Sequence, residues 1–229
     1  MIGNRDIQFY RVNGYLVVPS LFTDDECDRW IAILKNHTDD SFKRQVNIDR
    51  TDDEIRQMVH DSRIYTVLEK LLGKRVGYLA TQMLYKEPDS PFAKHAWNPH
   101  QDNFYVQAPA DEYYSATLIL GDSTPENGGM YFYPGSQTEP ILEHERHPSD
   151  DPNQNPGGKI LNIPSKFRRV DLWMKKGDLL IHHGQIIHGS TENNSKLSRY
   201  HFCICCATEG VIFNNPGQTS ERKYIPFHD

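Results

Sequence analysis

The stretch GDLLIHHGQIIHGS at residues 177–190, continued by TENNSKLSR at residues 191–199, decides the fold that we expect for this chain. An apolar run ends in His188, a polar cluster typical of a turn follows, and Arg199 opens a second apolar run. This pattern predicts a β-hairpin. A turn centred between Asn193 and Asn194 would place His188 directly opposite Arg199, with their Cβ atoms about 5 Å apart.

The two residues at the ends of this hairpin predict a metal site with an anionic ligand beside it. A neutral imidazole can hold a metal ion, and a guanidinium can bind a carboxylate through two parallel hydrogen bonds. Further ligands stand at His100 and Asp102, since side chains two residues apart on a strand point the same way. With His188 they make two imidazoles and one carboxylate, which is the ligand set of non-haem Fe(II) oxygenases.

Five motifs follow one another along the chain: His100-Gln101-Asp102, Glu126-Asn127-Gly128-Gly129, Pro134-Gly135-Ser136, His188-Gly189-Ser190 and Arg199. Together they resemble the phytanoyl-CoA dioxygenase family. The resemblance extends to residues 14–18 and 23–26, so it covers most of the chain. One departure is Gln137, where the family usually has a histidine after the Pro-Gly-Ser motif. That histidine is not a metal ligand in the family.

The resemblance implies a mainly β fold with flanking helices, namely a double-stranded β-helix (jelly roll, cupin-like). It also implies Fe(II), 2-oxoglutarate as co-substrate, and O₂. The iron ligands would be His100, Asp102 and His188. Because related halogenases lack the carboxylate, Asp102 indicates hydroxylation or a related oxidation. The residues expected to bind 2-oxoglutarate are Arg199 at its C5 carboxylate, Ser190 or Thr117 as a hydroxyl donor, and Gln82 near the iron.

Several of these residues also have a simpler interpretation. Arg199 alone fits a surface ion pair equally well, and Gln82 fits a strand amide that faces solvent. His182 and His183 are expected to be structural or to support the ligands, because a third imidazole would fill a position that the site needs open. The residues named for the substrate pocket, each of which also fits ordinary core or rim, are His95, Trp97, Phe104, Tyr105 and Met130. Buried strand positions explain Cys203, Cys205 and Cys206 better than a second metal site does.

The 229 residues are interpreted as one domain, with a helical N-terminal part of about 1–74 packing on a jelly-roll core of about 75–210. Helices are expected at 4–13 and after the capping signals at 23–26, 51–54 and about residue 62. A strand is expected at 15–18, and seven more short strands at 76–86, 114–120, 130–134, 159–163, 170–174, 179–183 and 199–207. Periodicity alone leaves a sandwich and a jelly roll open, and the resemblance favours the jelly roll. The polar segment 139–158 predicts a long loop of the kind that often serves as a lid or binding loop.

Composition limits the partners of the protein. A net charge of −6 argues against general nucleic-acid binding. No apolar run approaches the roughly 20 residues needed to span a bilayer, and the first residues lack the apolar core of a signal peptide. The four cysteines do not form a disulfide framework, so a reduced, cytoplasmic setting is expected.

The favoured hypothesis is an Fe(II)/2-oxoglutarate-dependent dioxygenase that oxidises, most simply by hydroxylation, a small organic molecule such as a secondary metabolite. It would release succinate and CO₂. A non-redox Zn²⁺ or Mn²⁺ hydrolase or isomerase on a cupin-like barrel would explain the triad but leave Arg199 and Ser190 without a role. A non-catalytic binding module is the third hypothesis, and the intact triad argues against it.

Overall fold

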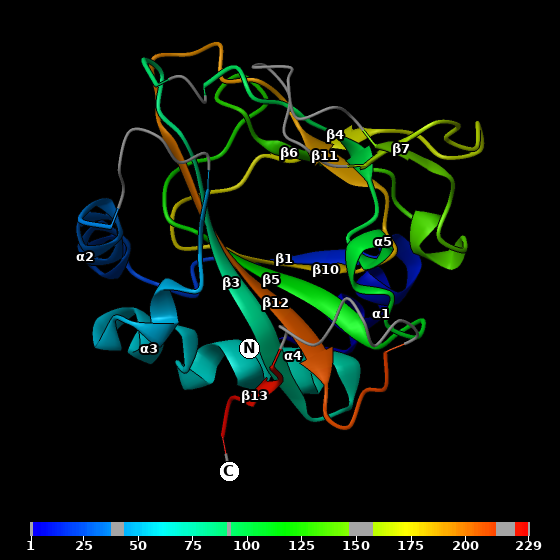
Figure 1. Ribbon diagram of the computed structural model, residues 1–229, viewed down its shortest axis with the longest axis horizontal. Coiled ribbons are helices and arrows are strands. Elements are labelled where there is room, and N and C mark those ends of the chain that lie inside the picture. Colours follow the sequence, from blue (N-terminus) through cyan, green and yellow to red (C-terminus); the bar gives the residue numbers. More distant parts are fainter. Residues whose placement is uncertain (1, 38–43, 91–92, 147–157, 214–222, 229) are drawn as a thin grey trace.

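Two antiparallel sheets face each other in this computed structural model, which describes residues 2–37, 44–90, 93–146, 158–213 and 223–228 (Figure 1). The large sheet has seven strands in the order β1-β10-β5-β12-β3-β13, with β2 also paired to β3. The small sheet has four strands in the order β4-β11-β6-β9. A two-stranded ribbon, β7-β8, lies beside them. The architecture is therefore mainly β with flanking helices, as predicted.

The elements have the following bounds. The helices are α1 (Asn4–Asn13), α2 (Asp24–Lys35), α3 (Asp53–Val59), α4 (Ser62–Leu72) and α5 (Asn103–Val106), with 3₁₀ turns at Ile48–Arg50 and Ser136–Thr138. The strands of the large sheet are β1 (Tyr15–Val18), β2 (Arg44–Val46), β3 (Val76–Lys86), β5 (Tyr113–Ile119), β10 (Leu179–His183), β12 (Arg199–Thr208) and β13 (Ile225–Pro226). The remaining strands are β4 (Trp97–His100), β6 (Met130–Phe132), β7 (His144–Arg146), β8 (Gly158–Ile160), β9 (Val170–Asp171) and β11 (His188–Ser190).

Local sequence signals place the N-terminal helices. Thr23 and Glu26 form the predicted capping box at the start of α2, each side chain bonding the other residue's backbone N–H. The second capping signal acts one residue later than expected, because the side chain that caps α3 is Asp52 rather than Thr51. Helix α4 ends as predicted at Gly73, which adopts the left-handed conformation that glycine favours.

Helices α1 to α4 cover the face of the large sheet that points away from the small sheet (Figure 1). Their apolar residues form the main core with alternate residues of β12, for example Phe202 and Ile204, each fully buried. Because side chains alternate along a strand, the intervening residues of β12 face the small sheet. Strand β1 comes from the N-terminal part of the chain and pairs with β10, so that part contributes to the sheet as well as to its cover.

The predicted hairpin is wrong. His188 on β11 pairs with His100 and Phe132 inside the small sheet, whereas Arg199 on β12 pairs with Lys86 inside the large sheet. Residues 191–198 therefore cross from one sheet to the other and do not form a tight turn. The turn prediction failed because a polar cluster between two apolar runs is compatible with either connection.

The predicted 139–158 loop is only partly described. Residues 147–157 lie outside the described ranges, and the flanking residues include β7 and β8, which pair with each other. Among the helices of the described residues, none combines the length and apolarity that a membrane crossing requires.

Candidate functional site

The three predicted metal ligands converge between the two sheets. His100 ends β4, His188 begins β11, and the pairing of these strands sets the two histidines side by side. Asp102 follows β4 at the start of α5, not on the strand as expected. One ligand atom from each of the three residues lies within 4.8 Å of the other two. This spacing suits a single ion held by two imidazoles and a carboxylate.

The two oxygens of Asp102 have different surroundings. Oδ1 faces the metal ligands, 3.4 Å from Nε2 of His100 and 3.7 Å from Nε2 of His188. Oδ2 lies 3.2 Å from Nε2 of His182 and accepts a 2.9 Å hydrogen bond from the Ser115 hydroxyl. One oxygen is thus left for an ion while protein groups hold the other, which is how ligating carboxylates are oriented in metal sites. His182 contacts a candidate ligand, Asp102, which agrees with one of the two roles predicted for it, support of the ligands.

The protonation states also suit a metal. Nδ1 of His100 lies 2.7 Å from the Asn98 carbonyl oxygen and Nδ1 of His188 lies 3.1 Å from the Ile186 carbonyl oxygen. Each Nδ1–H can donate there and leave Nε2 free to bind an ion. Burial, opposed by Asp102, lowers the pKa of His188 to about 3. Burial would raise the pKa of Asp102, but His188, His100 and His182 hold it well below its usual range. At neutral pH His188 is therefore neutral and Asp102 is ionised.

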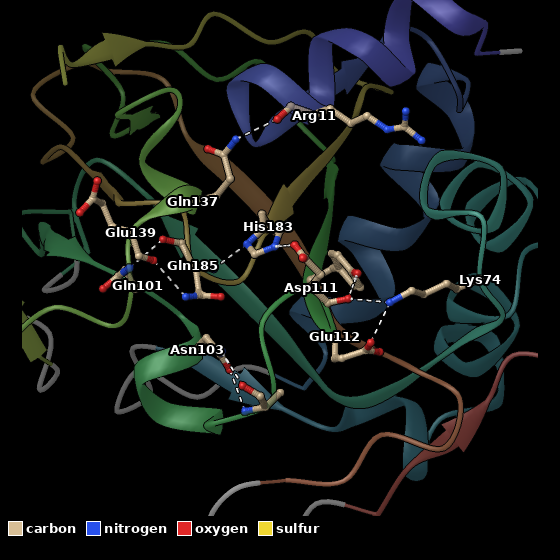
Figure 2. Close-up of polar contacts among 12 residues, drawn as sticks. Arg11, Lys74, Gln101, Asn103, Asp111, Glu112, Gln137, Glu139, His183 and Gln185 are labelled. Carbon is tan, nitrogen blue, oxygen red and sulfur yellow. Dashed lines mark hydrogen bonds and ion pairs between the residues drawn. The ribbon is translucent and has the colours of Figure 1, made fainter. Parts of the chain in front are cut away.

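Buried amides hold the backbone segments that carry the ligands. The amide of Gln101 donates to the backbone carbonyls of Pro140 and Gln185, and the Gln185 amide donates to the carbonyl of Glu139 (Figure 2). Asn103 exchanges two hydrogen bonds with the backbone of Ala108 and closes the loop after Asp102. These clamps fix the ligand positions from outside the cavity.

A second charged cluster lies at the start of β12. Arg199 is only 2% exposed and donates from Nε to the Gly128 carbonyl and from Nη1 to the Leu84 carbonyl. Lys86, directly opposite on β3, is also 2% exposed and donates to the Ser190 hydroxyl at 2.9 Å. Within the described residues neither cation has an ion-pair partner. Two buried basic groups without an acid fit an anionic ligand, which would offset the desolvation of their charged forms.

Burial perturbs the pKa values of this cluster. It lowers the pKa of Arg199 to about 9, so the guanidinium stays charged at neutral pH. Burial and then Arg199 lower the pKa of Lys86 well below its usual value, with Glu192 opposing them.

Lys86 was not identified in the sequence analysis. Its register opposite Arg199 would have revealed it, and that register depends on pairing between strands far apart in the chain.

A cavity of about 290 Å³ joins the metal ligands to Arg199. On the large sheet Arg199, Cys203 and Cys205 of β12 line it, with Gln82 and Thr117 opposite Cys203. Lys86, opposite Arg199, and Ser115, opposite Cys205, are not among the lining residues. The predicted residues that line the cavity are His100, Asp102, His188, Arg199, Ser190, Thr117, Gln82, Trp97, Tyr105 and Met130. The three candidate metal ligands and Arg199 thus share one cavity.

Comparison with known proteins agrees with this geometry. The family model described as phytanoyl-CoA dioxygenase (PhyH) matches residues 10–200. The chain belongs to the phytanoyl-CoA dioxygenase family. Phytanoyl-CoA dioxygenase domain-containing protein 1 of Mus musculus is 26% identical over 182 residues, which cover 77% of this chain and 60% of that protein. The chain thus spans less than two thirds of the length of this relative.

Solved structures show the fold of this family member to be the predicted double-stranded β-helix. The epimerase SnoN, in complex with Fe³⁺, alpha-ketoglutarate and nogalamycin RO, superposes with a TM-score of 0.78 at 23% identity, covering 93% of this chain and 86% of that one. The alpha-ketoglutarate-dependent carbocyclase SnoK from nogalamycin biosynthesis gives 0.77 at 19% identity, covering 100% and 94% of the two chains.

The family motifs that are not metal ligands now have structural roles. Gly128 has a φ of +91°, and any Cβ there would overlap the Lys86 side chain, so glycine leaves room for the anion site. Ser136 accepts a 2.8 Å hydrogen bond from the backbone N–H of Ile187, next to His188. Gln137, the departure from the family pattern, donates to the carbonyls of Arg11 and Val12 at the end of α1 (Figure 2).

Some predicted residues lie elsewhere. His95 is buried and Phe104 stacks on His144 with ring centroids 4.1 Å apart, and neither is among the residues lining the cavity. His183 lies 2.8 Å from the Asp111 carboxylate and its Nδ1 accepts from the backbone of Gln185, so its role is structural.

Proposed function

We propose that the protein is an Fe(II)- and 2-oxoglutarate-dependent dioxygenase that oxidises a small organic molecule and releases succinate and CO₂. One observation carries the proposal: a single cavity is lined by the His100–Asp102–His188 triad and by the buried Arg199. Lys86 lies beside Arg199 and donates to the hydroxyl of Ser190, which also lines the cavity. Neither Arg199 nor Lys86 has an ion-pair partner among the described residues. A dicarboxylate that reaches from the ion to these cations fits this arrangement. Family membership supports the same conclusion.

Different residues would bind the iron and the co-substrate. Iron bound at the triad would supply the redox centre at which O₂ and the 2-oxo acid react. His100 and His188 offer their Nε2 nitrogens, and Asp102 supplies the single negative charge of the ligand set. Arg199 and Lys86 would bind the C5 carboxylate by charge-assisted hydrogen bonds. The Ser190 hydroxyl, already bonded to Lys86, lies at the same end.

Thr117 and Gln82 line the cavity between the cations and the metal. We assign them contacts with the co-substrate, although both also face thiols: Thr117 bonds Cys203 and Gln82 donates to Cys205. Trp97, Tyr105 and Met130 are proposed to border the primary substrate.

A metal-dependent hydrolase or isomerase needs the triad but not the buried cations, which is why we favour the oxygenase. A non-catalytic binding module would not need two imidazoles whose Nε2 atoms face one carboxylate oxygen.

We propose that the reaction is the hydroxylation of a secondary metabolite. Asp102 leaves no ligand position for a halide, which favours oxygenation. The structurally similar SnoN and SnoK are an epimerase and a carbocyclase, so a shared fold allows several outcomes. A cytoplasmic location stays a prediction, in keeping with four free cysteines.

The test is succinate formation with Fe(II), 2-oxoglutarate and O₂ across a panel of small molecules, followed by mass analysis of products. His100→Ala, Asp102→Ala and His188→Ala should each abolish turnover and lower the bound iron, while circular dichroism stays unchanged. His37→Ala, at a partly exposed histidine outside the cavity, is the matched control. Turnover in any triad variant would remove that residue from the ligand set.

A further inference from the structure

Two thiols lie in the wall of the cavity that holds the metal ligands. Cys203 and Cys205 stand two residues apart on the cavity face of β12, each 7% exposed. Cys206 and Cys27 are 0% exposed and belong to the hydrophobic core on the other side of the large sheet. The chain therefore carries two cavity thiols and two buried thiols as internal references.

The two cavity thiols are held by neighbouring groups close to the ligand carboxylate. Cys205 accepts a 3.5 Å hydrogen bond from the Gln82 amide. Hydrogen bonds from Cys203 and Tyr113 help lower the pKa of Cys205 despite its burial. On the neighbouring strand Cys205 lies opposite Ser115, whose hydroxyl bonds Asp102. Facing residues on paired strands have Cβ atoms about 5 Å apart, so one side chain separates this thiol from a metal ligand.

We propose that Cys203 and Cys205 form an oxidation site that is modified when the protein turns over without its primary substrate. The inference rests on the proposed function. In the balanced step, one thiol sulfur gains one atom of O₂ and becomes a sulfenic acid. The other oxygen atom enters succinate as 2-oxoglutarate loses CO₂. The two electrons from the thiol and the two from 2-oxoglutarate together reduce O₂, so no other reductant is needed.

Strand geometry determines what happens to the oxidised sulfur. Residues two apart on a strand have Cα atoms about 6.6–6.8 Å apart, at the upper limit for a disulfide. Condensation of the sulfenic acid with the second thiol is therefore disfavoured. The sulfenic acid persists, or it takes a second oxygen to become a sulfinic acid, which ordinary thiols do not reverse. The thiols line the cavity that a primary substrate would enter, so a bound substrate would compete with them for oxidation.

The experiment incubates the full chain with Fe(II), 2-oxoglutarate and heavy-oxygen-labelled O₂, without a primary substrate, and with dimedone to trap sulfenic acid. Succinate is measured alongside fragment mass spectra of each cysteine. We expect heavy oxygen or a dimedone adduct on Cys203 or Cys205, roughly ten-fold above Cys206 and Cys27, because oxidation follows thiol access. Zn(II), which has no redox chemistry, should give none. In the double variant Cys203→Ala with Cys205→Ala the label should be lost, whereas Cys206→Ala should keep it.

Four results would overturn the inference. Succinate release with all four thiols unoxidised would contradict the oxidation site and would still support the proposed function. Equal oxidation of Cys206 and Cys27, or equal oxidation with Zn(II), would show bulk chemistry instead of a site. If no succinate forms even with long incubation and the substrate panel, the proposed function fails and this inference fails with it.

Discussion

At the scale of single residues, burying Arg199 beside Lys86 costs stability, and the lowered pKa of Lys86 limits that cost. Arg199 and Lys86 face each other on adjacent strands, where like charges repel. Each is nearly inaccessible to water and lacks an acidic partner among the described residues. A site that stores this cost gains binding energy when a carboxylate arrives, which is the usual compromise between stability and function.

The first prediction concerns Arg199. Arg199→Ala removes the fork that pairs with the C5 carboxylate and leaves that carboxylate partly desolvated. Loss of such a pair costs about 2–5 kcal/mol, or roughly 30-fold to several thousand-fold in 2-oxoglutarate affinity. Arg199→Lys keeps the charge but loses the planar geometry, so its loss should be smaller. Anaerobic titration of the Fe(II)–2-oxoglutarate absorption band measures both, and unchanged affinity in the alanine variant contradicts the anion site.

The second prediction concerns the proton on Lys86. Its pKa in the ligand-free site is lowered by burial and Arg199, and a bound carboxylate would raise it. Binding of 2-oxoglutarate should therefore take up protons at Lys86. The affinity should fall as the pH rises above the pKa of the ligand-free site. Calorimetry in buffers of different ionisation enthalpy measures the uptake, and Lys86→Met should abolish it.

The third prediction concerns the oxygen of Asp102 that the protein holds. Ser115→Ala removes the hydroxyl that donates to Oδ2 but leaves all three ligands. Outer contacts of this kind typically contribute about 10–100-fold to metal affinity or activity. We expect the metal affinity of Ser115→Ala to fall within that range, as measured by competition with a chelator. Ser136→Ala, which loses a bond to backbone near His188, provides a comparison at a different ligand.

At the scale of elements, β11 is the strand on which the small sheet depends. It lies between β4 and β6 and carries both His188 and Ser190. Gly189 lets the strand lie close to its neighbours, since a Cβ there would overlap the Tyr131 hydroxyl and the Trp97 carbonyl oxygen. The absence of a side chain at one position thus sets the distance between metal ligands on different strands.

The fourth prediction follows from that contact. Gly189→Ala should push β11 away from β4 and displace His188 relative to His100. A shift of about 1 Å at a catalytic group can cost on the order of 10²-fold in rate. Succinate formation should fall by that order, with reduced iron binding. Gly121→Ala, where the new Cβ would meet only an ordinary contact at 3.6 Å, should leave both unchanged.

Elements differed in how well the sequence predicted them. Helix α2 and strand β3 were predicted at their observed starts, because capping residues and apolar alternation act locally. The prediction that His188 pairs with Arg199 was wrong, because the sequence does not tell which sheet each strand joins. The triad was still identified, since its residues follow from spacing and family motifs. Lys86, Ser115 and the contact of His182 with Asp102 required the register between distant strands.

At the scale of the whole molecule, the proposed co-substrate would join the two sheets. His100 and His188 belong to the small sheet, and Arg199 and Lys86 belong to the large sheet. A dicarboxylate that binds the metal at one end and the cations at the other therefore contacts both layers. Ligand binding should then appear as a change in global stability as well as in activity.

The last prediction measures that coupling. A ligand that binds only the folded state adds about 3 kcal/mol at roughly 100-fold its Kd. That corresponds to about 5–10 °C in melting temperature for a chain of this size. Zn(II) prevents turnover because it has no redox chemistry, so Zn(II) with 2-oxoglutarate should raise the melting temperature beyond Zn(II) alone. In Arg199→Ala the increment from 2-oxoglutarate should disappear and that from Zn(II) should remain, because the ligands are intact. In His188→Ala the increase in melting temperature that Zn(II) gives should itself be lost, because a metal ligand is missing. If 2-oxoglutarate stabilised Arg199→Ala as much as the natural chain, the co-substrate would not bridge the sheets at this residue.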